Sequence, residues 1–270
     1  MAEHRIYVVD AFTDRAFAGN PAAVFPMESA TAIGETTMQR IAGEMNLAET
    51  SFVHPLPDVG PLDFGLRWFT PTVEVDLCGH ATLAAAHTMW ETGTVPARGE
   101  LRFHTRSGIL TASKTATGIA LEFPSEPPYE APLPDLPEFL GEPVFVGRNR
   151  MDWFVVLEPG LDLRTLKPNM AEIEALGLRG LIVTAAAAAI SPFDFTSRFF
   201  APCSGVPEDP VTGSAHCCLG PYWAETLERA CLTGYQVSAR GGVVRVTIAG
   251  ERVVLEGQAV TTLEGVLRCL

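Results

Sequence analysis

The sequence predicts an α+β protein of two similar lobes, each a β-barrel-like sheet wrapped around a central α-helix. Three observations support this fold class. A proline-rich stretch divides the 270-residue chain near its middle, and segments on its two sides match in order. Two segments with helical periodicity are also apolar on nearly every face, and such helices must be buried on all sides. Because each lies in a half made mostly of strands, we expect strands to surround both.

The proline-rich stretch, PSEPPYEAPLPDLP at residues 124–137, has six prolines in fourteen residues. Proline removes a backbone donor and fixes φ, so this stretch cannot form a central strand or a helix interior. We interpret it as a linker or an extended surface crossing. It predicts an N-terminal lobe at residues 1–127, a C-terminal lobe at 128–270, and an active site in the cleft between them.

The two halves resemble each other at one motif. Residues 63–71 (DFGLRWFTP) and 194–202 (DFTSRFFAP) are identical at five of nine positions, at an offset of 131. A turn-like stretch follows each segment, and then a glycine opens a helical pattern, at Gly79 and at Gly213. This repeated order predicts an internal duplication in which Phe69 superposes on Phe200 and Pro71 on Pro202.

The remaining elements are predicted from local pattern. Apolar residues at helical spacing predict helices at Glu35–Asn46, His80–Glu91 and Ser214–Arg229. Short runs rich in β-branched and aromatic residues predict strands between them. The predicted strands are Ile6–Asp10, Thr50–Val53, Phe64–Phe69, Leu101–Thr105, Ile109–Ser113, Ile119–Phe123, Val144–Val146, Trp153–Leu157, Leu181–Thr184, Phe193–Phe200, Tyr235–Ser238, Val243–Ile248 and Val253–Leu255.

Composition and missing motifs exclude several functions. The 32 Asp and Glu outnumber the 19 Lys and Arg, and a net charge of −13 disfavours binding to nucleic acid or anionic membranes. No secretory signal or membrane-spanning run is visible, so we expect a soluble, cytoplasmic protein. There is no nucleotide, metalloprotease or esterase motif, and none of the six cysteines forms a C-x-x-C pair. We therefore expect no metal and no cofactor.

The loops before the two apolar helices are the candidate site. A helix N-terminus presents N–H groups without intrahelical partners and a partial positive charge, which suits a carboxylate. Residues 76–82 (DLCGHAT) and 208–214 (EDPVTGS) hold these positions and gather side chains that can move protons. In a duplicated protein we expect the two loops to face each other and to form one acid/base site.

Several ordered motifs resemble the PhzF-type phenazine biosynthesis family. They span nearly the whole chain: Asp10–Thr13, Gly19–Pro21, Leu47–Phe52, Phe69–Pro71, Cys78–Thr82 and Glu208–Ala215. The family is similar to diaminopimelate epimerase, with the same two-lobed fold. The resemblance implies a homodimeric biosynthetic isomerase or epimerase that moves a proton on a small carboxylated metabolite without a cofactor.

The resemblance also implies roles for particular residues. Glu49, in the motif E-T-x-F, corresponds to the family's proton acceptor and donor, with His80 and Asp209 as further catalytic residues. The same motifs place Asn20, Cys78, Gly79, Gly213 and Ser214 around the substrate. A solvated carboxylate at Glu49, a core or capping histidine at His80, and capping roles for Asp209 and Ser214 are the structural alternatives.

Cys78 departs from the family pattern, and two other functions are open, one of which uses this thiol. Epimerase relatives exchange the α-proton between two thiols, one from each lobe. The second loop here has Asp209-Pro210 and no cysteine, so a symmetric two-thiol mechanism is not available. One alternative is a racemase that uses Cys78 with a carboxylate partner. The other is a non-catalytic protein that binds a metabolite in the retained cleft.

Overall fold

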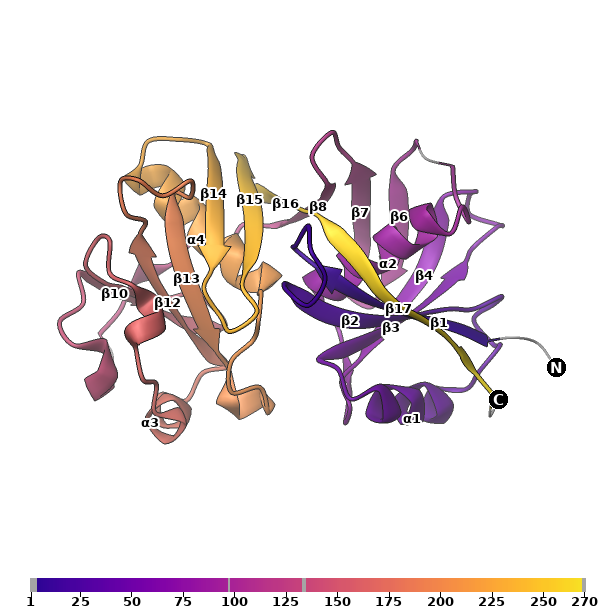
Figure 1. The fold of residues 1–270 in the computed structure, drawn as a ribbon, viewed down its shortest axis with the longest axis horizontal. Coiled ribbons are helices and arrows are strands. Elements are labelled where there is room, and N and C mark those ends of the chain that lie inside the picture. The colour runs from indigo at the N-terminus through magenta and orange to yellow at the C-terminus, as the bar shows by residue number, and fades with distance from the viewer. Residues whose placement is uncertain (1–3, 97, 133–134, 269–270) are drawn as a thin grey trace. The chain divides into compact units, whose positions relative to one another are not determined.

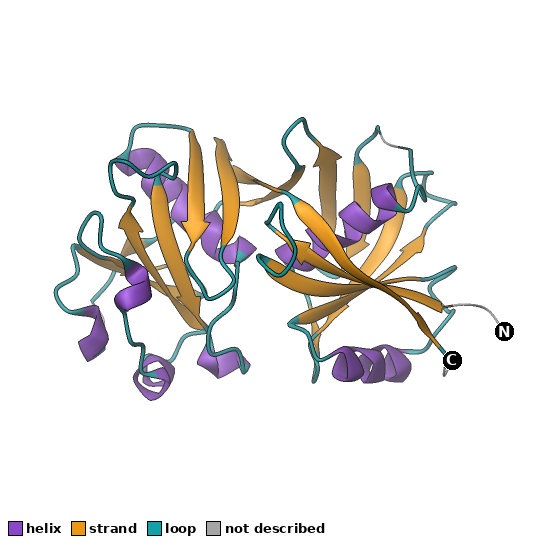
Figure 2. Ribbon diagram, viewed as in Figure 1, coloured by secondary structure: helices purple, strands orange, loops and turns teal. Residues whose placement is uncertain are grey.

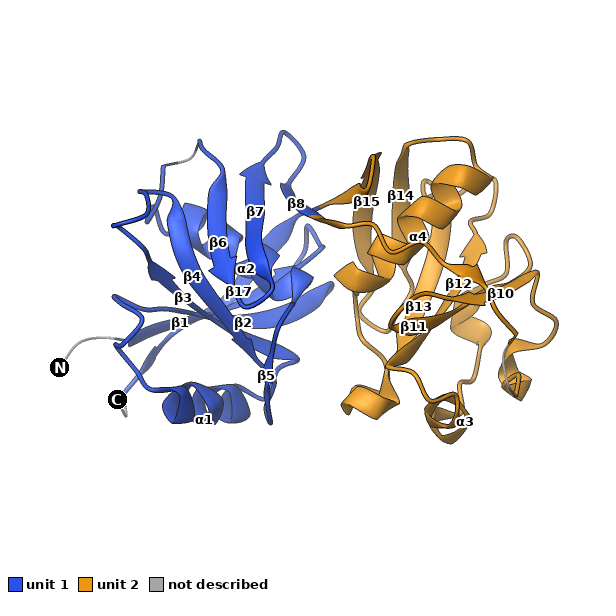
Figure 3. Cartoon of the chain, turned by 180° about the vertical axis from the view of Figure 1, so that it is seen from behind, with its two compact units in different colours: residues 1–122, 256–270 blue, residues 123–255 orange. Residues whose placement is uncertain are grey.

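The computed structural model describes residues 4–96, 98–132 and 135–268 (Figure 1). Within these ranges the fold is mixed, with many strands and few helices (Figure 2). The chain divides into two compact units (Figure 3). Unit 1 comprises Met1–Glu122 and Glu256–Leu270, and unit 2 comprises Phe123–Leu255.

This division differs from the predicted lobes at both boundaries. The chain leaves unit 1 within strand β8 (Ile119–Pro124) and returns to it within β16 (Arg252–Gly257). The last strand, β17 (Ala259–Leu267), belongs to unit 1 because it pairs antiparallel with β1 (His4–Ala11) along the whole length of β1. The C-terminal residues from Glu256 onward were therefore assigned to the wrong half.

Unit 1 contains one continuous series of paired strands. Their order across the sheet is β17, β1, β2, β3, β4, β6, β7, β8, in which β2–β3 and β4–β6 are parallel and the other pairs antiparallel. The remaining bounds are β2 (Asn20–Pro26), β3 (Glu49–Pro55), β4 (Asp63–Phe69), β5 (Glu74–Val75), β6 (Leu101–Thr105), β7 (Gly108–Lys114), α1 (Glu35–Met45) and α2 (Gly79–Glu91).

Unit 2 repeats this pairing scheme. Its order is β9, β10, β11, β12, β13, β14, β15, with β11–β12 and β13–β14 parallel. The bounds are β9 (Tyr129–Glu130), β10 (Phe145–Arg148), β11 (Asp152–Val156), β12 (Gly180–Ala186), β13 (Phe195–Phe200), β14 (Cys231–Gln236), β15 (Gly242–Ala249), α3 (Met170–Ala175), α4 (Gly213–Thr226), η1 (Glu138–Leu140), η2 (Leu163–Thr165) and η3 (Pro202–Ser204).

The strand register agrees with the predicted duplication. In unit 1 Phe69 lies opposite Thr50 across an antiparallel pair. In unit 2 Phe200 lies opposite Leu181, so both partners are displaced by the predicted 131 positions. The parallel pair Phe64–Phe103 has its counterpart in Phe195–Gly234 at the same displacement.

The two apolar helices form as predicted and are both largely buried. Ten of the thirteen residues of α2 are buried, and the helix contacts β1, β2, β3 and β17. Eight of the fourteen residues of α4 are buried, and it contacts β14 and β15. Helix α4 ends at Thr226, three residues before the predicted end, because Glu228 takes a left-handed conformation with φ 53° that cannot continue the helix. None of the helices is long and apolar enough to cross a membrane, among the residues described.

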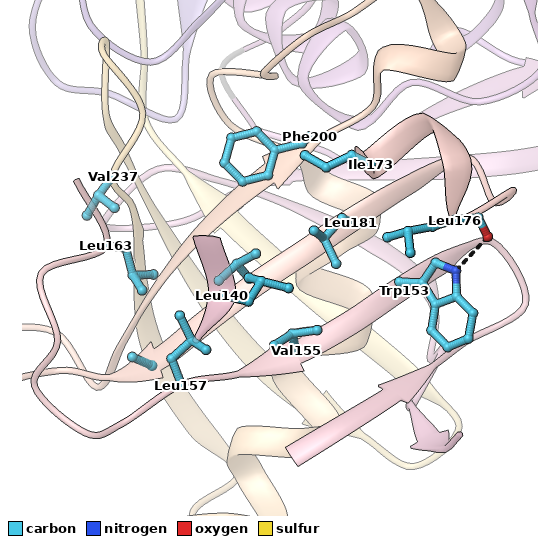
Figure 4. Packing of buried hydrophobic residues seen from close by; sticks show 12 residues of the cluster. Leu140, Trp153, Val155, Leu157, Leu163, Ile173, Leu176, Leu181, Phe200 and Val237 are labelled. Carbon is cyan, nitrogen blue, oxygen red and sulfur yellow. Dashed lines mark hydrogen bonds between the residues drawn. The ribbon is translucent and has the colours of Figure 1, made fainter. Parts of the chain in front are cut away.

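A hydrophobic cluster in unit 2 includes a short helix and a 3-10 turn that the sequence pattern did not predict. Helix α3 and the 3-10 turn η1 cover β11 and β12. Ile173 of α3 and Leu140 of η1 pack in one cluster with Leu181 of β12 (Figure 4). The indole N–H of Trp153 donates to the Leu176 carbonyl at 3.0 Å, which fixes the end of α3. With only six residues, α3 is too short for periodicity to detect.

Candidate active site

Four of the predicted site residues come together in unit 1. Asn20 opens β2 and Glu49 opens β3, and these parallel neighbours begin at the same edge of the sheet. Cys78 and His80 flank the first residue of α2, and this helix packs against both strands. The hydroxyl of Ser51 donates to the Ala81 carbonyl at 2.9 Å and so ties β3 to the first turn of α2.

His80 is the centre of this cluster. Its Nδ1 lies 3.3 Å from Asn20 Nδ2 and 3.5 Å from Cys78 Sγ, and its Nε2 lies 3.2 Å from Glu49 Oε2. Burial lowers the pKa of His80 to about 3, so the imidazole is neutral at neutral pH. An amide N–H and a thiol are both donors, and this hydrogen-bond network assigns Nδ1 as the acceptor. The ring proton is then on Nε2 and faces the Glu49 carboxylate.

Glu49 therefore lies beside a neutral imidazole, at a 3.2 Å contact that lacks hydrogen-bond geometry. Its side chain is 19% exposed, so the carboxylate is partly shielded from water yet reachable from one side. A carboxylate in such a position can accept a proton from a carbon acid and return it, while a neutral imidazole orients it without adding charge. His80 is buried, as the core alternative expects, and its ring also contacts Glu49.

Both helices begin without a side-chain cap. At α2 the N-cap residue is Cys78, and at α4 it is Thr212, and neither side chain bonds to the first-turn N–H groups. The Thr212 hydroxyl donates to the Asp209 carboxylate instead. Gly79 and Gly213 are the first helical residues and add no side chain there. Two helix N-termini are thus available to an anionic ligand.

Asp209 and Ser214 lie together in unit 2, at the start of α4. The Asp209 backbone N–H donates to the Phe199 carbonyl at 3.0 Å, and its carbonyl accepts from Gln236 Nε2 at 2.7 Å. Gln236 is fully buried and also accepts from the Thr212 N–H at 2.9 Å, so one amide side chain fixes this loop. Gln236 was not predicted, because it lies 24 residues beyond Thr212 on β14.

Two further charged residues near Ser214 were also missed. Arg179 Nη2 donates to the Ser214 hydroxyl at 3.0 Å and forms an ion pair with buried Asp152. Neither residue lies in a recognisable motif. The repeat could have indicated them. Gly180 occupies the same place at the start of β12 that Glu49 occupies at the start of β3, and Arg179 is the residue before Gly180.

Glu49, Cys78 and His80 could also hold a metal ion, because one ligand atom from each lies within 4.8 Å of the others. A single ring nitrogen of His80 completes this set with the thiol and the carboxylate. The same three residues are also placed for proton transfer, because the Glu49 carboxylate lies beside the imidazole.

The chain is similar to a known protein family and to solved structures. Residues 9–265 match the family model described as phenazine biosynthesis-like protein. An uncharacterized isomerase of Halalkalibacterium halodurans is 49% identical over 265 residues, 97% of each chain. The crystal structure of a PhzF-family phenazine biosynthesis protein from Enterococcus faecalis has a TM-score of 0.90 and 38% identity, covering 99% of this chain and 100% of that one. A hydroxyproline epimerase from Agrobacterium vitis shares the fold alone, with a TM-score of 0.60, 10% identity and coverage of 98% and 92%.

Proposed function

Because this chain belongs to the phenazine biosynthesis-like PhzF family and is an isomerase, we propose that it moves a proton on a small carboxylated metabolite by acid/base catalysis. Glu49 takes up the proton and returns it, and no cofactor takes part. The observation that carries this proposal is the contact of the half-buried Glu49 carboxylate with the neutral, buried His80. The neutral imidazole lies against the base without neutralising it.

The substrate carboxylate is assigned to the uncapped helix N-termini. Removal of a proton next to a carbonyl or an alkene spreads negative charge onto the substrate, and fixed N–H donors stabilise that charge best. The first residues of α2 lie directly beside His80, so an anion bound there would present its neighbouring carbon to Glu49. The small residue Gly79 allows this close approach.

Asp209 is assigned to the same reaction through the repeat. It precedes the first residue of α4 as Cys78 and its neighbours precede α2, and its carboxylate is oriented by the Thr212 hydroxyl. We propose that it relays or orients, together with His80, while Glu49 carries the central transfer. The likeness of fold to the hydroxyproline epimerase supports the further proposal that each unit is an epimerase-like lobe with strands wrapped around its central helix.

Cys78 serves in this proposal to position His80. It is 7% exposed, and its sulfur faces His80 Nδ1. A thiol that acted as the base would have to leave this contact and be deprotonated. The racemase alternative therefore predicts that alkylation of Cys78 abolishes proton exchange, whereas the Glu49 mechanism predicts that exchange does not require a free thiolate.

Proton NMR in D₂O tests the function directly. The protein is incubated with a panel of small carboxylic acids, and loss of a Cα–H or allylic signal reports exchange with solvent. We expect exchange for at least one acid with the wild type and none above background with Glu49→Gln. Binding of such an acid without exchange would support the non-catalytic alternative and contradict the proposal.

A further inference from the structure

Three side chains of the kinds that bind metals meet beside the start of α2. Glu49, Cys78 and His80 each offer one ligand atom, and these atoms lie within 4.8 Å of one another. Within residues 4–96, 98–132 and 135–268, no second set of three such side chains is this close. His87 and Glu91, further along the same helix, bring an imidazole and a carboxylate together but lack a thiol. The thiol of Cys78 therefore supplies the third ligand that a metal site needs.

The spacing of the sulfur and the imidazole suits a tetrahedral zinc ion. Zinc binds sulfur at about 2.3 Å and imidazole nitrogen at about 2.0–2.1 Å, so two such ligands lie about 3.5 Å apart. Cys78 Sγ lies 3.5 Å from His80 Nδ1. With the ring proton on Nε2, the lone pair of the imidazole is on Nδ1, and a metal can bind there without moving that proton. The Asn20 amide, which lies 3.3 Å from Nδ1, would give way to the ion.

The Glu49 carboxylate can complete the set without loss of a hydrogen bond to His80. Its contact with His80 Nε2 at 3.2 Å lacks hydrogen-bond geometry, and Nε2 has no hydrogen-bond partner within the described ranges. The side chain of Glu49 is 19% exposed and that of His80 is 6% exposed, so the carboxylate lies on the side from which an ion can approach. Three protein ligands leave the fourth tetrahedral position to water, as in zinc sites that exchange a ligand.

We propose that Glu49, Cys78 and His80 form an inhibitory site for a thiophilic divalent cation, Zn²⁺. On binding, the Cys78 thiol releases its proton to solvent, and the thiolate, one His80 nitrogen and one Glu49 oxygen each donate a lone pair to the ion. The ion then occupies the lone pair with which Glu49 would accept a proton from a carbon acid. A thiolate and an imidazole favour Zn²⁺ over Mg²⁺, which prefers oxygen ligands. Inhibition rests on the proposed function, whereas binding of the ion does not.

Cobalt absorption tests the binding. Co²⁺ can take the place of Zn²⁺ in a tetrahedral site, and a thiolate ligand gives it a strong near-ultraviolet charge-transfer band. We expect this band in the wild type, saturating at one Co²⁺ per chain, and we expect Zn²⁺ to remove it. Cys78→Ala should lose the band. Glu49→Gln should weaken binding by at least roughly tenfold, because loss of even an outer partner of a metal ligand costs about 10–100-fold.

Two variants are matched controls for this measurement. Glu91 is a carboxylate beside a histidine of the same helix, and Cys203 is an exposed thiol in unit 2. Glu91→Gln and Cys203→Ala should both bind Co²⁺ as the wild type does. Thermal unfolding confirms that each variant is folded.

Deuterium exchange tests the inhibition. With a substrate found in the D₂O screen, saturating Zn²⁺ should lower the wild-type exchange rate by roughly tenfold or more, and a chelator should restore it. Mg²⁺ at the same concentration should have no effect. Cys78→Ala, compared with its own metal-free rate, should resist Zn²⁺, whereas Cys203→Ala should be inhibited as the wild type is.

Three results would overturn the inference: no thiolate band in the wild type, an equal band in Cys78→Ala, or exchange that continues at the metal-free rate when Zn²⁺ is bound at Cys78. The proposed function fails separately. If no acid exchanges its proton but the cobalt band depends on Cys78 and Glu49, the metal site stands, and the isomerase mechanism falls together with the inhibition. If exchange requires Glu49 but no band forms, the mechanism stands and the metal site falls.

Discussion

Two buried histidines, His80 and His216, lie in the first turns of the two central helices, and both are held neutral. His80 Nδ1 is bracketed by Asn20 and Cys78, and His216 Nδ1 contacts the Thr212 carbonyl at 2.8 Å. Burial lowers their pKa values to about 3 and to about 4. Neutral imidazoles add no positive charge to the sites they support, so at His80 the carboxylate of Glu49 remains able to accept a proton.

The first prediction concerns acid stability. An unfolded histidine titrates near pH 6.5, whereas these two bind protons in the folded protein only near pH 3 and 4. The unfolded state therefore binds more protons as pH falls below 6.5, and the free energy of unfolding should decrease by roughly 1.4 kcal/mol per pH unit for each histidine between pH 6 and 4. Above pH 7 these residues should cause no change.

Urea unfolding at several pH values measures this slope. His216→Asn keeps a donor toward the Thr212 carbonyl and removes one titrating group, so its slope should be smaller than that of the wild type by roughly 1.4 kcal/mol per pH unit. Imidazole signals of His80 and His216 that titrate near pH 6.5 in the folded protein would show that burial does not suppress their protonation.

The second prediction is an order of severity at the active site. Glu49→Gln keeps size and hydrogen bonding but removes the base, so turnover should fall by roughly 10²–10⁴-fold. His80→Ala and Asp209→Ala should reduce turnover less, since they orient or relay. Cys78→Ala should be mildest, because Asn20 still donates to His80 Nδ1. The measurement is single-turnover deuterium exchange into the substrate found in the D₂O screen.

Glu91 provides the matched control for Glu49. It contacts His87 at 3.3 Å at the other end of α2, so it is also a glutamate beside a histidine of that helix. Glu91→Gln should exchange deuterium at the wild-type rate. An inactive Cys78→Ala together with a fully active Glu49→Gln would assign the proton to the thiol.

At the scale of elements, the site depends on how β2, β3 and α2 are held together. Parallel pairing brings the starts of β2 and β3 to one edge, and the buried face of α2 places His80 against them. β17 contributes from the far end of the sequence, because it pairs with β1, which in turn pairs with β2. The geometry around Asn20 therefore depends on a strand more than 200 residues away.

The third prediction follows from this pairing. A chain that ends at Gln258 lacks β17 and leaves β1 paired with β2 alone. We expect its melting temperature to fall by roughly 10 °C or more, together with fast amide exchange in β1 and a tendency to aggregate through the exposed edge. A chain that ends at Leu267 keeps β17 and is the control. Unchanged amide protection in β1 after loss of β17 would contradict the prediction.

At the scale of the whole molecule, one strand-pairing scheme appears twice, with different chemistry beside the buried helix of each unit. In unit 1 the carboxylate of Glu49, the first residue of β3, contacts His80, and in unit 2 the guanidinium of Arg179, the residue before β12, contacts Ser214. In the proposed mechanism the Glu49 carboxylate of unit 1 handles the proton. Duplication followed by divergence is a simple route from two equivalent units to two units with different charged side chains beside the buried helix.

The fourth prediction is that the protein is a homodimer, as the family resemblance implies. Leu263 and Val266 on β17 are 49% and 43% exposed, which is unusual for large apolar residues of a strand and is compatible with burial against a second chain. Light scattering at micromolar concentration should give twice the 29.0 kDa of one chain. A single-chain mass that persists at high concentration would contradict it.

The fifth prediction is that turnover needs no metal or cofactor. A carboxylate base and fixed hydrogen-bond donors supply the steps of a proton transfer without either. Purified protein should show no visible chromophore, and deuterium exchange should continue at the same rate after extensive dialysis against a chelator. Loss of exchange that is restored by Zn²⁺ would instead assign Glu49, Cys78 and His80 as ligands of a catalytic metal.

The sequence by itself determined the features that local pattern encodes. Apolar residues on every face of the helix beginning near His80 require burial, and the repeat around Phe69 and Phe200 already implied the strand register found. The motifs also identified Glu49, His80, Cys78 and Asn20, which the fold brings together.

Only the tertiary structure decided the rest, because it depends on contacts between residues far apart in the chain. The assignment of β17 to unit 1 comes from pairing with β1, and periodicity carries no information about such a partner. The neutrality of His80 comes from its burial. The contact of Arg179 with Asp152 and Ser214 joins three segments, none of which has a motif that includes the other two. Long-range packing thus sets the charge state of His80 and the orientation of Arg179.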